Sequence, residues 1–271
     1  MFRQPVLIYN PAAGALRRNP DRILQRTIAA LAHGDIAPRP LPTSAPGHAD
    51  VLAREAVLQG ADLVLVLGGD GTVNEVVQGL IGSNVPLGVL PGGTANVLAM
   101  ELGLGSRLET AAKRLVAFEP RPVALGRITG SFGSRYFLLM AGAGLDANIV
   151  YEVSAGLKNA VGKLAYWAAG LPHFFKHVDQ LNVRVVTNGD DNVTRTCGFA
   201  LVSRVRNYGG DLEIASGASL HDDHFEVVLF EGSNPLRYAW YMLNVAARRT
   251  MNTTKNPLAA LSTVMSAMAI G

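Results

Sequence analysis

The stretch Leu63–Leu67 (LVLVL), followed by Gly68–Thr72 (GGDGT) and Val73–Leu80 (VNEVVQGL), decides the fold of this chain. The run of leucine and valine is typical of a strand buried on both faces, and the glycines end it. A helix is expected to begin at Thr72, because Thr72 and Glu75 have the spacing of a capping box. Strand, glycine turn and helix together predict one unit of a parallel α/β sheet.

The glycine loop indicates a phosphate site. Gly68, Gly69 and Gly71 leave the backbone bare, so that its N–H groups can approach an anion at the positive end of a helix. The carboxylate of Asp70 repels phosphate unless Mg²⁺ bridges the two or the carboxylate accepts a proton from an attacking hydroxyl. Both possibilities point to phosphoryl transfer with Asp70 as the catalytic candidate. A simple tight turn is the alternative interpretation.

Further strands and helices alternate on both sides of this unit. The predicted strands end in loops of small or polar residues, at Asn10–Gly14, at Thr43 and at Pro91–Asn96. In a doubly wound parallel sheet such loops share one edge, and ligands bind there. The predicted strands are 5–9, 39–42, 63–67 and 85–90, and the predicted helices are 21–33, 47–59, 72–80, 97–100 and 107–118.

Beyond Pro120 the pattern changes to successive strands, which favours an antiparallel sheet. We therefore expect two domains: residues 1–120 as a doubly wound parallel-sheet domain, and residues 121–271 as an antiparallel β-rich domain. An aromatic and basic segment, Leu157–Phe175, interrupts the second domain and predicts either a helix covering the sheet or a membrane-facing element. The predicted strands are 123–128, 136–141, 181–186, 194–203, 213–215 and 225–230.

Composition narrows the function classes. The chain has 271 residues, 49% hydrophobic and 17% charged, which is an ordinary globular balance. A net charge of +3 falls short of a nucleic-acid-binding surface but suits an anionic membrane. Cys197 is the only cysteine, and no apolar run of about 18 residues is present. We expect a cytoplasmic protein without a transmembrane segment, compatible with peripheral membrane association.

Two other motifs fit known sites less well. Gly142–Ala147 matches the dinucleotide fingerprint formally, but no strand with an acidic residue follows it at the required distance. His221–His224 resembles a transition-metal cluster, yet four adjacent residues entering a strand point to alternate faces. A turn is the simpler interpretation, in which one carboxylate and backbone carbonyls can still bind Mg²⁺.

Three ordered motifs resemble the diacylglycerol kinase catalytic-domain family: Asn10-Pro-x-x-Gly14, Gly68–Glu75 and Pro91–Asn96. The resemblance covers roughly residues 5 to 232, and the family includes soluble bacterial lipid kinases and the sphingosine and ceramide kinases. It implies ATP- and Mg²⁺-dependent transfer of the γ-phosphate to a lipid hydroxyl at a membrane surface, with diacylglycerol as the first expectation.

The resemblance implies that residues 1–120 bind the nucleotide and that residues 121–271 form a lipid-acceptor domain, incomplete at its C-terminus. It also implies site residues. Asp70 would lie near the transferring phosphate and Mg²⁺, and Asp146, facing the cleft, is a secondary candidate. A structural Mg²⁺ would be bound by the carboxylate of Asp222 with the backbone carbonyls of Ser219 and His224. The implied ATP contacts are Asn10, Thr43, Gly68, Gly69, Asp70, Gly71, Thr72, Val73, Asn74, Gly93 and Thr94.

Some residues depart from the family pattern. Val97 follows Asn96 where the family usually has aspartate, and the usual Asp-Gly of the metal segment is Asp222-Asp223. The late strand carrying Asp-Gly-Glu, whose glutamate acts as the base in the family, is missing before Gly271. A catalytically impaired nucleotide- or lipid-binding remnant therefore remains an alternative. So does an NAD kinase-like enzyme, which shares the Gly-Gly-Asp-Gly loop. The sequence does not decide between a monomer and a dimer.

Overall fold

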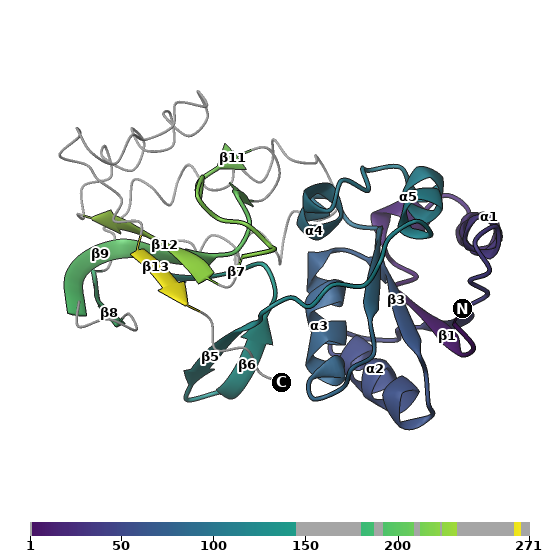
Figure 1. Ribbon diagram of the computed structural model, residues 1–271, viewed down its shortest axis with the longest axis horizontal. Helices are drawn as coiled ribbons and strands as arrows, with labels where there is room; N and C mark the ends of the chain where they lie inside the picture. The colour runs from purple at the N-terminus through teal and green to yellow at the C-terminus, as the bar shows by residue number, and fades with distance from the viewer. Residues whose placement is uncertain are drawn as a thin grey trace. The chain divides into compact units, whose positions relative to one another are not determined.

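A computed structural model describes residues 2–144, 180–186, 192–208, 212–222, 224–231 and 263–266. The chain divides into two compact units (Figure 1). The first is formed mainly by Met1–Pro122 and Arg127–Leu138, and the second by Val123–Gly126 and Leu139–Ile270. The chain therefore passes to the second unit, returns for a short hairpin, and passes over again.

The first unit is built on a four-stranded parallel sheet. Its strands follow the order β2-β1-β3-β4, so the chain enters the sheet at β1 and extends it in both directions. In the observed register Leu7 lies opposite Pro40 on one side and Leu65 on the other. All residues of β3 are buried, as its apolar sequence predicts. The strands are β1 (Pro5–Tyr9), β2 (Arg39–Pro42), β3 (Leu63–Gly68) and β4 (Leu87–Pro91).

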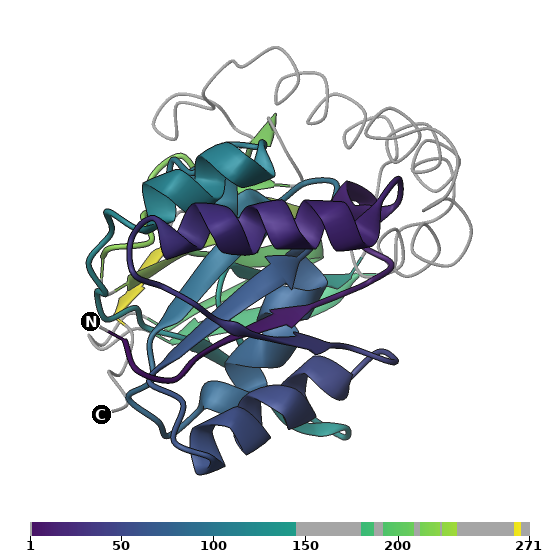
Figure 2. The ribbon, with the colours of Figure 1, turned by 90° about the vertical axis from the view of Figure 1, so that its right-hand side faces the viewer.

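Helices cover both faces of this sheet. Figure 2 shows α1 and α5 on one face and α2 and α3 on the other. The helices α2 and α3 approach closely at Gly79, where an added Cβ would lie 2.3 Å from the carbonyl oxygen of Asp50. The predicted doubly wound α/β arrangement is confirmed. The helical elements are η1 (Gly14–Leu16), α1 (Pro20–Ala32), α2 (His48–Leu58), α3 (Asp70–Leu80), α4 (Val97–Glu101) and α5 (Leu108–Leu115).

The predicted start of α3 and its capping box are wrong. The helix begins at Asp70, two residues before Thr72, because Gly69 adopts an extended conformation and takes the N-cap position. Thr72 therefore lies inside the first turn. The carboxylate of Glu75 instead accepts a hydrogen bond from the backbone N–H of Ala49, at 3.3 Å, and so links α3 to the first turn of α2.

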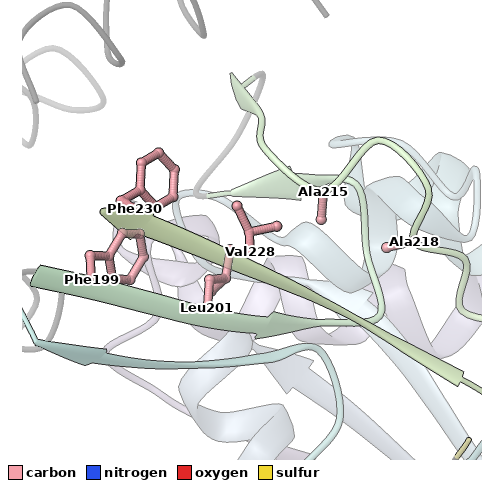
Figure 3. Packing of buried hydrophobic residues seen from close by; sticks show 6 residues of the cluster. All are labelled: Phe199, Leu201, Ala215, Ala218, Val228 and Phe230. Carbon is pink, nitrogen blue, oxygen red and sulfur yellow. The ribbon is translucent and has the colours of Figure 1, made fainter. Parts of the chain in front are cut away.

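The second unit contains an antiparallel sheet, as predicted. Its strands follow the order β13-β12-β9-β7, with β8 also paired to β9. One face carries a cluster that includes Phe199, Leu201, Val228 and Phe230 (Figure 3), and the other face buries Cys197 with its neighbours. The strands are β7 (Met140–Gly144), β8 (Leu181–Val186), β9 (Asn192–Ser203) and β12 (His224–Glu231), with β13 (Thr263–Ser266), and a separate pair β10 (Asn207–Tyr208) and β11 (Leu212–Glu213).

The predicted strands 123–128 and 136–141 are misplaced. The chain forms a hairpin of β5 (Gly126–Gly130) and β6 (Gly133–Phe137) before β7 begins. Residues 131 and 132 form the turn, and β6 begins directly after it at Gly133, whose φ of +92° suits glycine and few other residues. Leu157–Phe175 lies outside the described residues. Within the described ranges, no helix combines the length and apolar character needed to cross a bilayer.

Candidate active site

Four loops meet at the carboxyl edge of the parallel sheet. The backbone N–H of Asn10, after β1, donates to the carbonyl of Leu67 at 3.1 Å. The N–H of Thr43, after β2, donates to the carbonyl of Tyr9 at 2.8 Å. The predicted residues at the ends of β1, β2, β3 and β4 are therefore brought to one edge, where doubly wound folds bind their ligands.

The two Gly-Gly loops contact each other backbone to backbone. The N–H of Gly92 donates to the carbonyl of Gly68 at 2.9 Å. A Cβ added to Gly92 would lie 2.8 Å from the nitrogen of Gly68, and one added to Gly93 would lie 2.5 Å from the Cα of Gly69. Only glycine fits this contact, because side-chain carbons do not approach backbone atoms so closely. The pairing leaves a bare main-chain surface at the edge of the sheet.

Asn96 locks the second of these loops. It is buried and adopts a left-handed conformation with φ of +49°. Its side-chain oxygen accepts from the N–H of Gly93 at 2.7 Å, and its side-chain nitrogen donates to the carbonyl of Gly93 at 2.9 Å. Asparagine tolerates this conformation better than most residues. The sequence placed Asn96 in the loop after a predicted strand, but it did not indicate that both of its side-chain groups would hold Gly93.

Asp70 lies in the first turn of α3, where the helix dipole favours a carboxylate. One carboxylate oxygen accepts a hydrogen bond from the backbone N–H of Leu98, at 3.3 Å, in the first turn of α4. The side chain is partly exposed. A carboxylate fixed between two helix starts, beside bare glycine backbone, can hold a metal-bound phosphate or accept a proton.

The remaining predicted nucleotide contacts differ in exposure. Gly71 and Thr94 are exposed, and a Cβ added to Gly71 would meet no atom within 4 Å. Thr72 and Asn74 are partly exposed on α3. The side chain of Val73 is buried in the core, so any contact it makes with a ligand comes from its main chain.

Comparison with known proteins gives a consistent family. The family model for the diacylglycerol kinase catalytic domain matches residues 4–128. A diacylglycerol kinase of Bacillus subtilis is 30% identical over 233 residues, covering 84% of this chain and 74% of that protein. The chain belongs to the diacylglycerol kinase family. A Mycobacterium tuberculosis diacylglycerol kinase is also 30% identical, over 68% of this chain and 59% of that protein.

Solved structures of this family share the fold. A crystal structure of a diacylglycerol kinase from Bacillus anthracis has a TM-score of 0.69 at 23% identity, covering 89% of this chain and 78% of that one. Another crystal structure from the same organism has a TM-score of 0.75 at 21% identity, covering 98% of this chain and 84% of that one. The two-unit α/β and β architecture of this diacylglycerol kinase family member is thus the fold of its structural relatives.

The second candidate site of this family member is the turn before β12. The N–H of Asp222 donates to the carbonyl of Ser219 at 3.4 Å, which brings those two predicted metal ligands into one turn. The partly exposed carboxylate of Asp222 lies 3.6 Å from Nε2 of His224. Within the described ranges, no group of three or more His, Cys, Asp or Glu side chains is placed to hold a metal. A cation here would rely on one carboxylate, carbonyls and water, a donor set that Mg²⁺ accepts.

Two buried ionisable residues that the sequence did not single out shape this turn. The guanidinium of Arg204, 1% exposed, donates to the carbonyls of Ala124 and Leu220, each at 2.8 Å, and to that of Asp222. The carboxylate of Glu226 accepts from the N–H of Gly217 at 2.8 Å. Burial raises the pKa of Glu226 above its ordinary value, and nearby Glu213 adds to the rise, whereas the backbone N–H groups and His224 oppose it.

The available signal for Glu226 was a charged residue within a strand-like sequence, and for Arg204 a charged residue directly after one. Such residues are seldom buried without partners. The secondary candidate of this family member, Asp146, lies outside the described residues.

Proposed function

We propose that the protein is an ATP- and Mg²⁺-dependent lipid kinase that phosphorylates a hydroxyl, with diacylglycerol as the first acceptor to test. The hydroxyl oxygen bonds to the γ-phosphorus, the bond between that phosphorus and the β–γ bridging oxygen breaks, ADP leaves, and the hydroxyl releases its proton. Membership of the diacylglycerol kinase family and the printed names of the bacterial relatives support this assignment.

One observation carries the proposal: the backbone contact between the two glycine loops, which lies directly before Asp70 in the chain. Gly92 and Gly93 pack on Gly68 and Gly69 so closely that no side chain fits between the loops. Phosphate groups can then approach main-chain N–H donors directly, at a helix start that favours an anion. The glycine contact and the adjacent carboxylate suit a magnesium nucleotide better than they suit an uncharged ligand.

We assign the chain's residues distinct tasks. The N–H groups in the first turn of α3 orient the phosphates, and Asn10, Thr43 and Thr94 bind the rest of the nucleotide. Mg²⁺ supplies charge neutralisation when it is bound. Asp70 holds that ion or accepts the hydroxyl proton, and the N–H of Leu98 keeps its carboxylate in place. Positioning and charge stabilisation supply most of the rate in phosphoryl transfer.

The test replaces Asp70 by asparagine, which preserves an oxygen for the N–H of Leu98. We expect nucleotide binding to stay within a few-fold, while diacylglycerol phosphorylation falls by a factor of roughly 10² to 10⁴. The matched control is Asp21→Asn, because Asp21 also lies in the first turn of a helix, but of α1. Near-normal lipid phosphorylation by Asp70→Asn would contradict the assignment.

A second assay identifies the acceptor. Diacylglycerol, sphingosine and ceramide in mixed micelles are compared with NAD as phosphate acceptors, using labelled ATP. We expect label in a lipid and none in NAD. Label in NAD alone would show that the phosphate acceptor is a dinucleotide and not a lipid.

We further propose that the turn at Asp222 binds a structural Mg²⁺ through its exposed carboxylate and the carbonyls of Ser219 and His224. The melting temperature of the wild-type protein should rise with added Mg²⁺, because an ion that binds only the folded state stabilises it. Asp222→Asn should lose that rise. An equal rise in the variant would place the ion elsewhere.

A further inference from the structure

The β5–β6 hairpin carries exposed apolar side chains on a basic surface. Every residue from 127 to 135 is exposed. The side chain of Phe132, in the turn, is 64% exposed, more than any other phenylalanine among the described residues, and Ile128 is 39% exposed. Exposing a phenylalanine to water costs free energy that contact with an apolar phase would recover.

The charge around these side chains has one sign. Arg127 and Arg135 lie in the exposed part of the hairpin, and no aspartate or glutamate occurs between Glu119 and Asp146. Within the described part of the chain, neither arginine makes an ion pair with a carboxylate. Two arginines beside an exposed ring match the surface of an anionic bilayer, where phosphates lie just outside the acyl chains.

The hairpin is also anchored to the candidate active site. The side-chain nitrogen of Gln78 on α3 donates to the carbonyl of Tyr136 at 2.8 Å, and the N–H of Tyr136 donates to the side-chain oxygen of Gln78 at 3.0 Å. Figure 1 shows β6 beside α3. Gln78 follows Asp70 by eight residues, about 12 Å along the helix. The same rigid helix therefore carries Asp70 and the anchor of the hairpin.

We propose that the β5–β6 hairpin is a membrane-contacting element, in which Phe132 and Ile128 enter the interface of an anionic phospholipid bilayer while Arg127 and Arg135 bind lipid phosphates. The inference rests on the proposed function, since it explains how a lipid hydroxyl is reached. The Gln78–Tyr136 pairing then sets the distance between the bilayer and the nucleotide loop.

The experiment measures sedimentation of the full chain with phosphatidylcholine vesicles, with and without phosphatidylglycerol. We expect binding only to the anionic vesicles. Phe132→Ser should weaken it about tenfold. Arg127→Gln with Arg135→Gln should weaken it by about fivefold per arginine at low salt. The loss from the arginine variant should shrink as salt rises, because screening removes the charge contribution, whereas the loss from Phe132→Ser should persist.

Matched controls remove similar groups elsewhere. Leu58→Ser removes an 81% exposed apolar side chain at the end of α2, and Arg18→Gln with Arg22→Gln removes two exposed charges, one just before α1 and one in its first turn. Both should bind anionic vesicles like the wild type. Unchanged vesicle binding by Phe132→Ser and by the hairpin arginine variant would overturn the proposal. So would a change of oligomeric state in Phe132→Ser with unchanged vesicle binding, because the hairpin would then be a protein contact.

A parallel assay with dispersed short-chain diacylglycerol separates this proposal from the kinase assignment. The hairpin variants should phosphorylate the short-chain lipid at the wild-type rate, since that acceptor needs no bilayer. If the wild type binds vesicles through the hairpin but phosphorylates no lipid, the kinase assignment fails while the hairpin proposal stands.

Discussion

The loops beside Asp70 and the turn before β12 keep their shapes in opposite ways. In the first unit, Gly68 and Gly69 contact Gly92 and Gly93 through main-chain atoms. In the second unit, residues 215–222 are held by the buried side chains of Arg204 and Glu226, which bind main-chain carbonyls and N–H groups. The first arrangement requires the absence of side chains, and the second requires their presence.

This contrast matters for recognition and for function. A close backbone contact restricts its positions to glycine, so it can be recognised in the sequence as a glycine motif. A turn held by long side chains leaves no motif, because the supporting residues lie elsewhere in the chain. The backbone contact also leaves the glycine loops open for an anion. In the second turn, by contrast, the guanidinium of Arg204 already binds the carbonyls of Leu220 and Asp222.

The largest effect should come from removing the side chain that organises the second turn. Arg204→Leu leaves three carbonyls, one buried and two partly buried, without their donor, and we expect a loss of about 3–5 kcal/mol in the free energy of unfolding, measured by urea denaturation. Arg204→Lys keeps the charge but not the forked donor geometry, so its loss should be smaller. A loss below about 1 kcal/mol in Arg204→Leu would show that the turn keeps its conformation without the arginine side chain.

The glycine contact should be broken by a single methyl group. Gly93→Ala places a Cβ 2.5 Å from the Cα of Gly69, and we expect a loss of about 1–3 kcal/mol by the same measurement. Gly71→Ala is the control, since its Cβ would meet nothing within 4 Å. Because alanine is the better helix former, Gly71→Ala should gain about 0.5–1 kcal/mol. Equal effects of the two substitutions would remove the steric argument.

Asn96 separates side-chain bonding from backbone strain within the first region. Asn96→Gly loses both hydrogen bonds to Gly93 but tolerates the positive φ, whereas Asn96→Ala loses the bonds and adds strain. Alanine should therefore cost about 1 kcal/mol more than glycine in thermal or urea unfolding. If the two variants are equally stable, the conformation at Asn96 carries no strain.

The smallest effect is a pH dependence at Glu226. Burial raises its pKa in the folded state, so its contribution to stability is fully present below the unfolded pKa, about 4.3, and is lost as pH rises through the folded pKa. The stability of the wild type relative to Glu226→Gln should therefore fall as pH rises over that range. The two unfolding free energies are compared by urea titration at each pH. A constant difference between them would exclude Glu226 as the source of the pH dependence.

The architecture of the first unit was predictable because its signals are local. Apolar runs such as Leu63–Leu67 and the glycine loops that end them identify parallel strands, and alternation with helices fixes their direction. The start of α3 was not predictable, because Thr72 and Glu75 have the spacing of a capping box, whereas Gly69, which takes the N-cap position, has no side chain to signal a cap. Glu75 was misassigned for a similar reason: its partner, the N–H of Ala49, lies on another helix.

The candidate site also contains features with local sequence signals and features that depend on residues distant in the chain. Asp70 and the two Gly-Gly loops could be found from the sequence because their spacing carries the chemistry. The bonds from Leu98 to Asp70 and from Gln78 to Tyr136 could not, since both join residues distant in the chain. The roles of Arg204 and Glu226 depend in the same way on distant main-chain groups.

The sequence alone determined that a parallel sheet would place the carboxylate of Asp70 in a glycine loop at the end of a buried strand, because strand burial and glycine sterics act over a few residues. Only the tertiary structure decided which main-chain groups hold that carboxylate, that an arginine organises the turn before β12, and that an exposed Phe132 is anchored to the helix of Asp70. Those relations depend on where separate elements pack, and packing is settled by the whole chain at once.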